Sequence, residues 1–411
     1  MGKQHVVLID RSGYGAYRYP DGRPYLDPER YLVTLVTLAE KADTPLPGEV
    51  ARVVPTNVLD PQAIMDAVPE LAAGPPVDRV VASGERLLVP AARVREALGV
   101  PGYRVDQIQV FRDKPTMKRY FAGTGVRIPE FAEISRPLDA GDLLDRHGTI
   151  ILKPVDSMGS NGLHRVTSHA ELAELENTGL AAAGAYEAEE FIEGQMFHID
   201  SVVSGGHAKV AVPWRYLEPT SGFSVGGQLR SVVLEGGELH DRLLAVNARI
   251  LAAAPWFSGA THLELFLTPA GELVFCEIAG RAGGGGIVPA FAHRFGVNLN
   301  AAVLLPQLDR PVPEVAEVQP ADRRHTGYSI IYTPAVGTLR GYTDVPDEDW
   351  VLDVKLTKKP GDVLKVPGSV GAAVAIVTVC GPDAATVAHR LDQAQAALTL
   401  DIERETIGVA A

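Results

Sequence analysis

The stretch over residues 261–289 constrains the fold of this chain more than any other. It contains two apolar runs, 262–267 and 273–278, joined by a turn with proline and glycine. Apolar runs separated by such a turn predict a β-hairpin. Each run carries one carboxylate, Glu264 and Glu277, and pairing across a hairpin brings residues of one face together. We therefore expect these two carboxylates to lie side by side.

Two like charges buried next to each other cost free energy unless a cation lies between them. Mg²⁺ takes oxygen ligands and keeps positions for phosphate oxygens, so the pair predicts a magnesium site, with Mn²⁺ as the alternative metal. Arg281 and a run of four glycines, 283–286, follow the hairpin. A backbone without side chains can approach a ligand closely. The alternative is an edge hairpin with two solvated glutamates, and the other motifs decide between the two.

The bulk composition excludes several classes of protein. The chain has 411 residues, enough for two or three domains with their own cores. Its net charge of −13 disfavours binding to nucleic acid or to a membrane surface, because a polyanion would be repelled. The two cysteines, Cys276 and Cys380, form neither a disulfide framework nor a metal knuckle. The first residues read as a strand, and no apolar run could span a bilayer, so we expect a cytoplasmic protein.

The first 112 residues alternate between strand and helix patterns. The strands are expected over 5–9, 50–55 and 78–83, and the helices over 31–41, 61–73 and 87–98. This alternation predicts a small parallel α/β domain. Gly13 and Gly15 follow the first strand, but a full G-x-G-x-x-G is absent, which argues against a dinucleotide site.

The middle of the chain contains candidate phosphate-binding residues. Lys114 opens a helix for which Asp113 is a plausible N-cap, and Lys153 ends a strand over 149–154. Residues 156–162 follow, with two glycines, two serines and an asparagine. Loops of this composition offer N–H and O–H donors that cradle phosphates, although the Walker pattern is absent and a plain turn is the alternative.

A further strand, over residues 186–194, runs into a turn. Its alternating faces would place Phe191 and Ile192 near a flat apolar slot, with backbone groups free to bind the edge of a base. The last segment, from about residue 326, has strands followed by one amphipathic helix over 383–398. This order predicts a small α+β subdomain.

In their order along the chain, these segments resemble the ATP-grasp ligases and are most similar to the bacterial L-amino acid ligases. The resemblance covers most of the chain, and its motifs are 80–100, 112–118, 152–162, 189–194 and 264–286. It implies an α/β protein, α+β overall, with the ATP-grasp fold. The implied domains are an N-terminal parallel α/β domain over 1–112, an ATP-grasp domain over 113–325 and a C-terminal α+β cap over 326–411. The nucleotide-binding subdomain would cover about 113–195.

The resemblance also implies a nucleotide site. Lys114 and Lys153 would face the ATP phosphates as point charges. Glu189 would accept the adenine amino group, and the backbone of Glu190, Phe191 and Ile192 would hold the edge of the base. The loop residues that would close over the γ-phosphate are Ser157, Gly159, Ser160 and Gly162. The ribose contact is the first departure from the family, because the usual glutamate is missing and Gln195 is the available candidate.

The same resemblance assigns Glu264 and Glu277 as magnesium ligands and Arg281 as the arginine that steadies the transferred phosphoryl group. With Arg281, the implied catalytic residues are Lys153, Ser157 and Ser160. A second departure is Ala279, where the family usually has asparagine, so a second metal site would depend on Glu277 alone, with phosphate oxygens and water.

The implied reaction is an ATP-dependent ligation of a small carboxylic acid to an amine. The carboxylate attacks the γ-phosphorus of ATP, and the amine then displaces phosphate from the acyl-phosphate, which gives an amide, ADP and phosphate. Two amino acids, or an amino acid and another natural-product amine, are the expected biosynthetic substrates. An ATP-grasp carboxylase and a nucleotide-binding regulatory protein without ligase activity are the alternatives. The resemblance also allows a homodimer.

Overall fold

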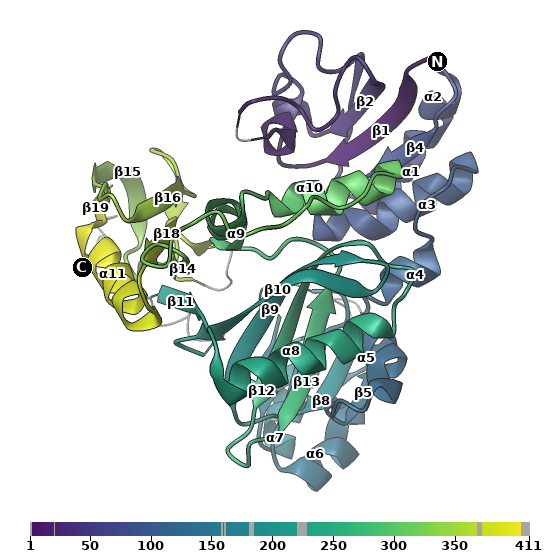
Figure 1. The fold of residues 1–411 in the computed structure, drawn as a ribbon. Coiled ribbons are helices and arrows are strands. Elements are labelled where there is room, and N and C mark those ends of the chain that lie inside the picture. The colour runs from purple at the N-terminus through teal and green to yellow at the C-terminus, as the bar shows by residue number, and fades with distance from the viewer. Residues whose placement is uncertain are drawn as a thin grey trace, which may run out of the picture.

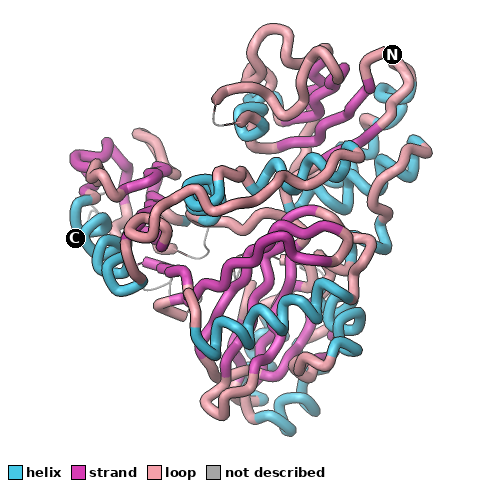
Figure 2. The backbone as a smooth tube through the Cα atoms, viewed as in Figure 1, coloured by secondary structure: helices cyan, strands magenta, loops and turns pink. Residues whose placement is uncertain are grey.

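The computed structural model describes residues 2–19, 21–157, 159, 162–180, 185–219, 228–367 and 372–403. The chain forms an N-terminal unit, a central body and a C-terminal unit, with strands concentrated in the central body (Figures 1 and 2). The sheets of these three parts position the candidate site.

The N-terminal sheet is parallel throughout, in the order β3-β2-β1-β4. Its strands are β1 (Gln4–Asp10), β2 (Tyr31–Thr37), β3 (Arg52–Pro55) and β4 (Arg79–Val81), and the accompanying helices are α1 (Pro61–Asp66), α2 (Val68–Ala72), α3 (Leu88–Leu98) and α4 (Val105–Gln109). The parallel α/β arrangement expected from the sequence is therefore confirmed.

The helix predicted over residues 31–41 is wrong. Residues Tyr31–Thr37 form β2, which lies between β1 and β3, and only the short 3₁₀ turn Ala39–Lys41 follows. Nearly every residue of β2 is buried. A parallel strand covered on both faces has a continuous apolar run, which fits helical spacing as well as strand spacing.

A segment from much later in the chain completes the core of the N-terminal unit. Helix α10 (Leu299–Leu304) and the 3₁₀ helix η8 (Leu305–Leu308) place Ala301, Leu304, Leu305 and Leu308 in one apolar cluster with residues of β1 and β2. Figure 1 shows α10 running beneath this sheet. The buried Gln307 donates to Ala82 O at 2.8 Å and accepts from Ala82 N at 3.2 Å. The N-terminal unit therefore depends on residues far from it in sequence.

The central body contains an eight-stranded sheet in the order β13-β12-β9-β10-β11-β14-β18-β16. Its strands are β9 (Gln195–Ser204), β10 (His207–Tyr216), β11 (Gln228–Val233), β12 (Gly259–Leu267), β13 (Leu273–Ala279), β14 (His325–Ile331), β16 (Val351–Leu356) and β18 (Ala375–Gly381). β14, β16 and β18 come from the C-terminal segment, so the sheet continues past residue 325. The domain boundaries given by the resemblance remain a prediction.

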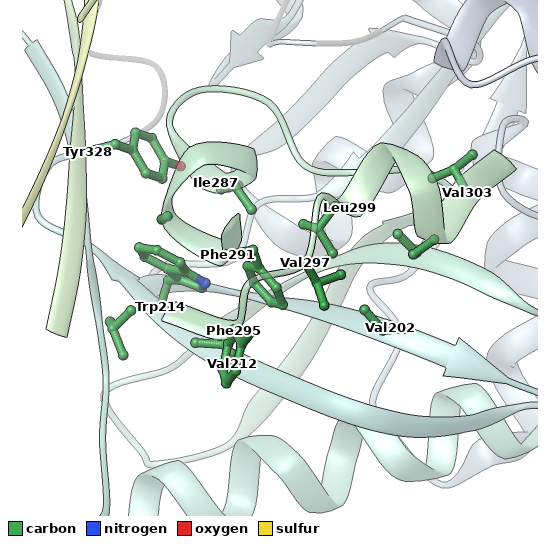
Figure 3. Packing of buried hydrophobic residues seen from close by; sticks show 14 of the residues in the cluster. Val202, Val212, Trp214, Ile287, Phe291, Phe295, Val297, Leu299, Val303 and Tyr328 are labelled. Carbon is green, nitrogen blue, oxygen red and sulfur yellow. The ribbon is translucent and has the colours of Figure 1, made fainter. Parts of the chain in front are cut away.

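Each face of this sheet has its own core. One face packs against α5 (Lys114–Phe121) and α8 (Gly237–Ala252), with Leu263, Leu265 and Ile278 in the contact. The opposite face packs against α9 (Ile287–Phe295), where Phe291 and Phe295 meet Trp214 (Figure 3). Glu264 lies on this second face, since strand residues alternate and its neighbours Leu263 and Leu265 belong to the first core.

Two smaller sheets flank the large one. The first has the order β5-β8-β6-β7, with β5 (Phe131–Ile134), β6 (Ile150–Pro154), β7 (His164–Val166) and β8 (Tyr186–Glu190), next to α6 (Gly141–His147) and α7 (His169–Asn177). The second contains β15 (Gly337–Asp344), β17 (Val363–Leu364) and β19 (Thr399–Glu403). Helix α11 (Ala384–Ala397) contributes Val387 and Leu391 to the apolar core of the C-terminal unit.

The glycine run between β13 and α9 packs tightly against the large sheet. A Cβ added at Gly286 would collide with Thr378 and Tyr328, whereas one added at Gly284 would meet open space. We expect Gly286→Ala to lower the free energy of unfolding by about 1–3 kcal/mol, because the clash must be relieved in a packed core. Gly284→Ala is the matched control and should change it by less than about 0.5 kcal/mol. Urea unfolding of both variants decides this, and equal losses would contradict the packing described.

Candidate active site

A cavity of about 500 Å³ opens between the small sheet of β6 and β8 and the β9–β14 part of the large sheet. It brings together most of the residues singled out from the sequence. These are Lys114, Lys153, Ser157, Gly159, Glu189, Glu190, Phe191, Ile192, Gln195, Glu264, Glu277 and Arg281. Gly162 is not among the lining residues, and Ser160 lies outside the described residues.

The two candidate metal ligands face each other on neighbouring strands. β12 and β13 form the expected antiparallel hairpin, and Glu264 pairs directly with Glu277. The register then shifts, so that Leu265 pairs with Phe275 and Cys276 becomes the extra residue of a β-bulge. Cys276, the extra residue of this bulge, lines the cavity. The hairpin and its pairing are confirmed, and the metal role of the two glutamates stays a prediction.

The surroundings of this carboxylate pair suit a divalent cation. Tyr216 donates to Glu264 Oε1 at 2.8 Å, and Lys114 Nζ lies 3.6 Å from Glu277 Oε2. Among the described residues, no donor hydrogen-bonds to Glu264 Oε2 or Glu277 Oε1, which leaves one oxygen of each carboxylate for a metal. Burial opposes ionisation of Glu264, but His262 lowers its pKa to about 2. The oxygen donors therefore fit Mg²⁺, which prefers such ligands.

A buried cluster next to Glu264 was missed from the sequence. Asp200 accepts from both His198, Nδ1 to Oδ2 at 2.7 Å, and His262, Nδ1 to Oδ1 at 3.0 Å. Burial lowers the pKa of His262, but the Asp200 carboxylate more than offsets this and raises it to about 10. His262 pairs with Ala279 across the hairpin, so a charged imidazole lies opposite the position where the family usually has asparagine. His262 and Glu264, two residues apart on one strand, share a face, and this spacing was the available signal.

We predict an acid-sensitive contribution to stability from Asp200. Burial opposes its ionisation, but His262 and His198 lower its pKa from 3.8 to about 2. The folded state thus binds this proton more weakly than the unfolded chain does. The ion pairs therefore stabilise the fold fully above about pH 4, and their contribution is lost as the pH falls toward 2.

Urea unfolding of the wild type and Asp200→Asn across that pH range measures this contribution. The difference in unfolding free energy should narrow as the pH falls. The exposed Asp347→Asn is the control and should show no such trend. A difference for Asp200→Asn that is independent of pH would contradict the assignment.

The two candidate phosphate lysines lie in a network of charges. Lys153 Nζ is 2.5 Å from Glu189 Oε1, and Lys114 Nζ donates to Ser157 O at 2.7 Å. Lys118, which the sequence analysis did not single out, is fully buried and donates to Glu187 at 2.7 Å and to Glu189 at 2.5 Å. The sequence feature that could have identified Lys118 is its four-residue spacing from Lys114 on one helix. The Glu189 carboxylate is thus engaged by two lysines, and its contact with adenine stays a prediction.

At the end of β8, where the backbone would bind the base, some of the backbone groups already form hydrogen bonds within the protein. Glu190 N donates to Glu130 O at 2.8 Å, and Phe191 N donates to Thr149 O at 3.3 Å. Ile192 is buried at the cavity wall, and the exposed Gln195 donates through its side-chain amide to Tyr216 O at 2.7 Å. Contact between Gln195 and the ribose stays a prediction.

Arg281 is tied to the N-terminal unit through a residue that the sequence analysis also missed. Its Nε donates to Glu85 Oε2 at 2.6 Å, and Arg112 pairs with the other oxygen of the same carboxylate. Arg112 also donates to Asp156 O at 2.5 Å, next to the candidate phosphate loop. Glu85 lies in the short 3₁₀ helix Glu85–Leu87 and is 8% exposed. One buried carboxylate therefore holds two arginines, and one of them, Arg281, lines the cavity.

Two family models match the chain. Residues 31–102 match the ATP-grasp N-terminal domain, and residues 329–403 match the L-amino acid ligase C-terminal domain 2. Both matches lie outside the cavity-lining strands β9–β13. They agree with the resemblance that the central motifs indicated. In the part of the chain that the structure describes, every helix is too short or too polar to cross a membrane.

Relatives and solved structures agree with the matches to the two family models. The chain is 25% identical over 350 residues to the L-arginine-specific L-amino acid ligase of Bacillus subtilis, which covers 82% of this chain and 83% of the relative. It is 23% identical over 269 residues to the alanine–anticapsin ligase of the same organism, 59% of this chain and 56% of that one. The L-amino acid ligase from Bacillus licheniformis superposes with a TM-score of 0.77 at 20% identity, over 98% of this chain and 99% of the other. The ATP-grasp fold and the resemblance are confirmed.

Proposed function

We propose that this chain, which has the ATP-grasp fold, is an ADP-forming carboxylate–amine ligase. The observation that carries the proposal is the pair Glu264 and Glu277, which lines a cavity together with Lys114, Lys153 and Arg281. Two carboxylates and three cations around one space match the needs of phosphoryl transfer, which depends on alignment and charge neutralisation rather than on a protein nucleophile. The relatives named as L-amino acid ligases support amino acids as substrates.

The residues of the cavity divide into two groups in this proposal. Lys114 and Lys153 bind the ATP phosphates, and the strand end at Ile192 receives the base through its backbone. Glu264 and Glu277 would hold Mg²⁺, which when bound polarises the phosphate oxygens and offsets their charge. A cytoplasmic location and a homodimer belong to the same proposal.

The ligation itself proceeds in two steps at the carboxylate pair. A substrate carboxylate oxygen attacks the γ-phosphorus, the bond to the β-phosphate oxygen breaks, and ADP leaves. Arg281 holds the phosphoryl group as it moves, because its planar guanidinium can bind two oxygens at once. The amine nitrogen then attacks the acyl carbon, phosphate leaves, and the nitrogen releases its proton. Ser157 and Gly159, at the mouth of the cavity, help to keep water from the acyl-phosphate.

The experiment is ADP release from Mg-ATP across amino acids supplied singly and in pairs. The expected result is release that requires a particular pair, with a product whose mass equals their condensation. Release with bicarbonate in place of an amine would favour the carboxylase alternative. ATP that raises the melting temperature without any turnover would favour a regulatory nucleotide-binding protein.

A further inference from the structure

The cavity extends well beyond the carboxylate pair, and its far part is apolar. We call five of its lining residues the apolar wall: Tyr216, Leu229, Ile287, Tyr328 and Ile330. The two lysines assigned to the ATP phosphates come from α5 and β6, whereas the apolar wall comes from β10, β11, α9 and β14. The apolar wall therefore faces the space left for the carboxylate substrate, and the inference that follows rests on the proposed function.

The sheet register fixes the shape of this wall. Leu229 of β11 pairs directly with Ile330 of β14, and Ser231 pairs with Tyr328 two residues along the same ladder, on the same face. Ile287 comes from the first turn of α9 and lines the same cavity as Tyr328. Both also belong to one buried cluster (Figure 3). All five side chains of the wall are buried, so the wall is a preformed surface.

The wall begins at the point of reaction. Tyr216 donates its hydroxyl to Glu264 at 2.8 Å, so its ring starts directly beside the candidate metal ligand. Ile330 lies two strands further along, in the order β10-β11-β14, which is roughly 10 Å at a strand spacing of about 4.8 Å. A carboxylate placed at Glu264 and Arg281 would thus extend a large side chain along the wall.

The charged residues near the apolar wall do not favour a substrate with a charged side chain. Glu218 accepts from Arg230 N at 2.8 Å and from Arg230 Nε at 2.7 Å, and Glu264 is committed to Tyr216 and the candidate metal. A cationic side chain would lose its water without gaining a free partner, and such burial is costly.

From these observations we propose that the amino acid activated at its carboxylate carries a large apolar side chain, seated against the apolar wall. Burial of such a side chain is favourable in proportion to its apolar area. Leucine, methionine and phenylalanine have suitable dimensions, whereas the charged ends of arginine, lysine and glutamate would find no ion-pair partner among the residues of the wall.

Hydroxylamine trapping tests this selectivity without knowledge of the amine substrate, because hydroxylamine converts any acyl-phosphate to a hydroxamate. The assay uses the full chain with Mg-ATP and each amino acid in turn. We expect kcat/KM for leucine, methionine or phenylalanine to exceed that for arginine, lysine and glutamate by at least about tenfold. A charged amino acid as the best substrate would overturn the proposal.

Two variants test whether the apolar wall determines the selectivity for the amino acid substrate. Ile330→Ala should lower kcat/KM for the preferred amino acid by roughly 5–20-fold and leave the KM for ATP unchanged. Ile376→Ala is the matched control, since Ile376 pairs with Ile330 on the next strand but does not line the cavity. Equal effects of the two variants would show that the wall is not the subsite. If Ile330→Ala does not fold, Leu229→Met changes the same wall with little change in volume and should reorder the preferred substrates.

A failure of the proposed function has a different signature. If no amino acid gives a hydroxamate or ADP, the ligase proposal fails. The subsite is then tested by measuring which amino acids raise the melting temperature of the protein in the presence of Mg-ADP. A rise with apolar amino acids alone supports the subsite, and a rise with charged ones, or with none, overturns it.

Discussion

Glu277→Gln is expected to reduce ADP release by about 1,000-fold while leaving the melting temperature nearly unchanged. Glutamine keeps the shape of the side chain but removes one of the two charges that would hold the metal. A bound divalent cation is worth several kcal/mol to phosphoryl transfer, and about 1.4 kcal/mol corresponds to a tenfold change in rate. The side chain of Glu277 is 29% exposed at the cavity, and the buried Lys114 beside it keeps its hydrogen bond to Ser157 O, so little stability should be lost.

The measurement is kcat for ADP release over a range of Mg²⁺ concentrations, together with a melting curve. Glu272→Gln is the matched control, because Glu272 precedes the second strand of the same hairpin, is 53% exposed at the side chain and does not line the cavity. The control should retain full activity. Normal turnover by Glu277→Gln would show that the carboxylate pair is not the metal site.

The second large effect is expected for Arg281. Arg281→Met should lower kcat by about 1,000-fold or more, since arginines that stabilise a transferred phosphoryl group contribute about 10³–10⁵. Arg281→Lys should recover only part of this, because a lysine cannot bind both Glu85 and two phosphoryl oxygens. Nucleotide binding, measured as the rise in melting temperature with Mg-ADP, should persist in both variants.

Two controls separate the loss of the cation from damage to the site. Arg86→Met removes an exposed arginine next to Glu85 and should change nothing. Glu85→Gln keeps Arg281 but removes the carboxylate that holds it, so a smaller loss of kcat is expected. An Arg281→Met enzyme with undiminished kcat would remove this residue from the proposed mechanism.

The sequence was most informative where function and local pattern coincide. The pairing of Glu264 with Glu277 could be predicted because a hairpin turn and two apolar runs leave few registers. Lys114 and Lys153 were found for a similar reason, since each lies at the end of a recognisable element. Local pattern failed for β2, where burial on both faces removes the alternation that distinguishes a strand.

Contacts between distant parts of the chain could not be predicted from one sequence. Glu85 and Arg281 are 196 residues apart, and Asp200 and His262 are 62 apart. Neither pair belongs to a motif with fixed spacing. The apolar wall was hidden for the same reason, because the pairing of β11 with β14 joins strands from either side of α8, the hairpin and α9.

The contribution of α10 and η8 to the N-terminal core determines when the N-terminal unit can fold during synthesis of the chain. Domains usually fold as they leave the ribosome, from the N-terminus onward. Here Leu304, Leu305 and Leu308 complete the core of β1 and β2, so that core cannot close until nearly 200 residues beyond residue 112 have been synthesised. During that time the apolar face of the first sheet is exposed in the nascent chain. Separate expression of residues 1–112 should therefore give an aggregating fragment, and a nascent chain of this protein is a natural client for chaperones.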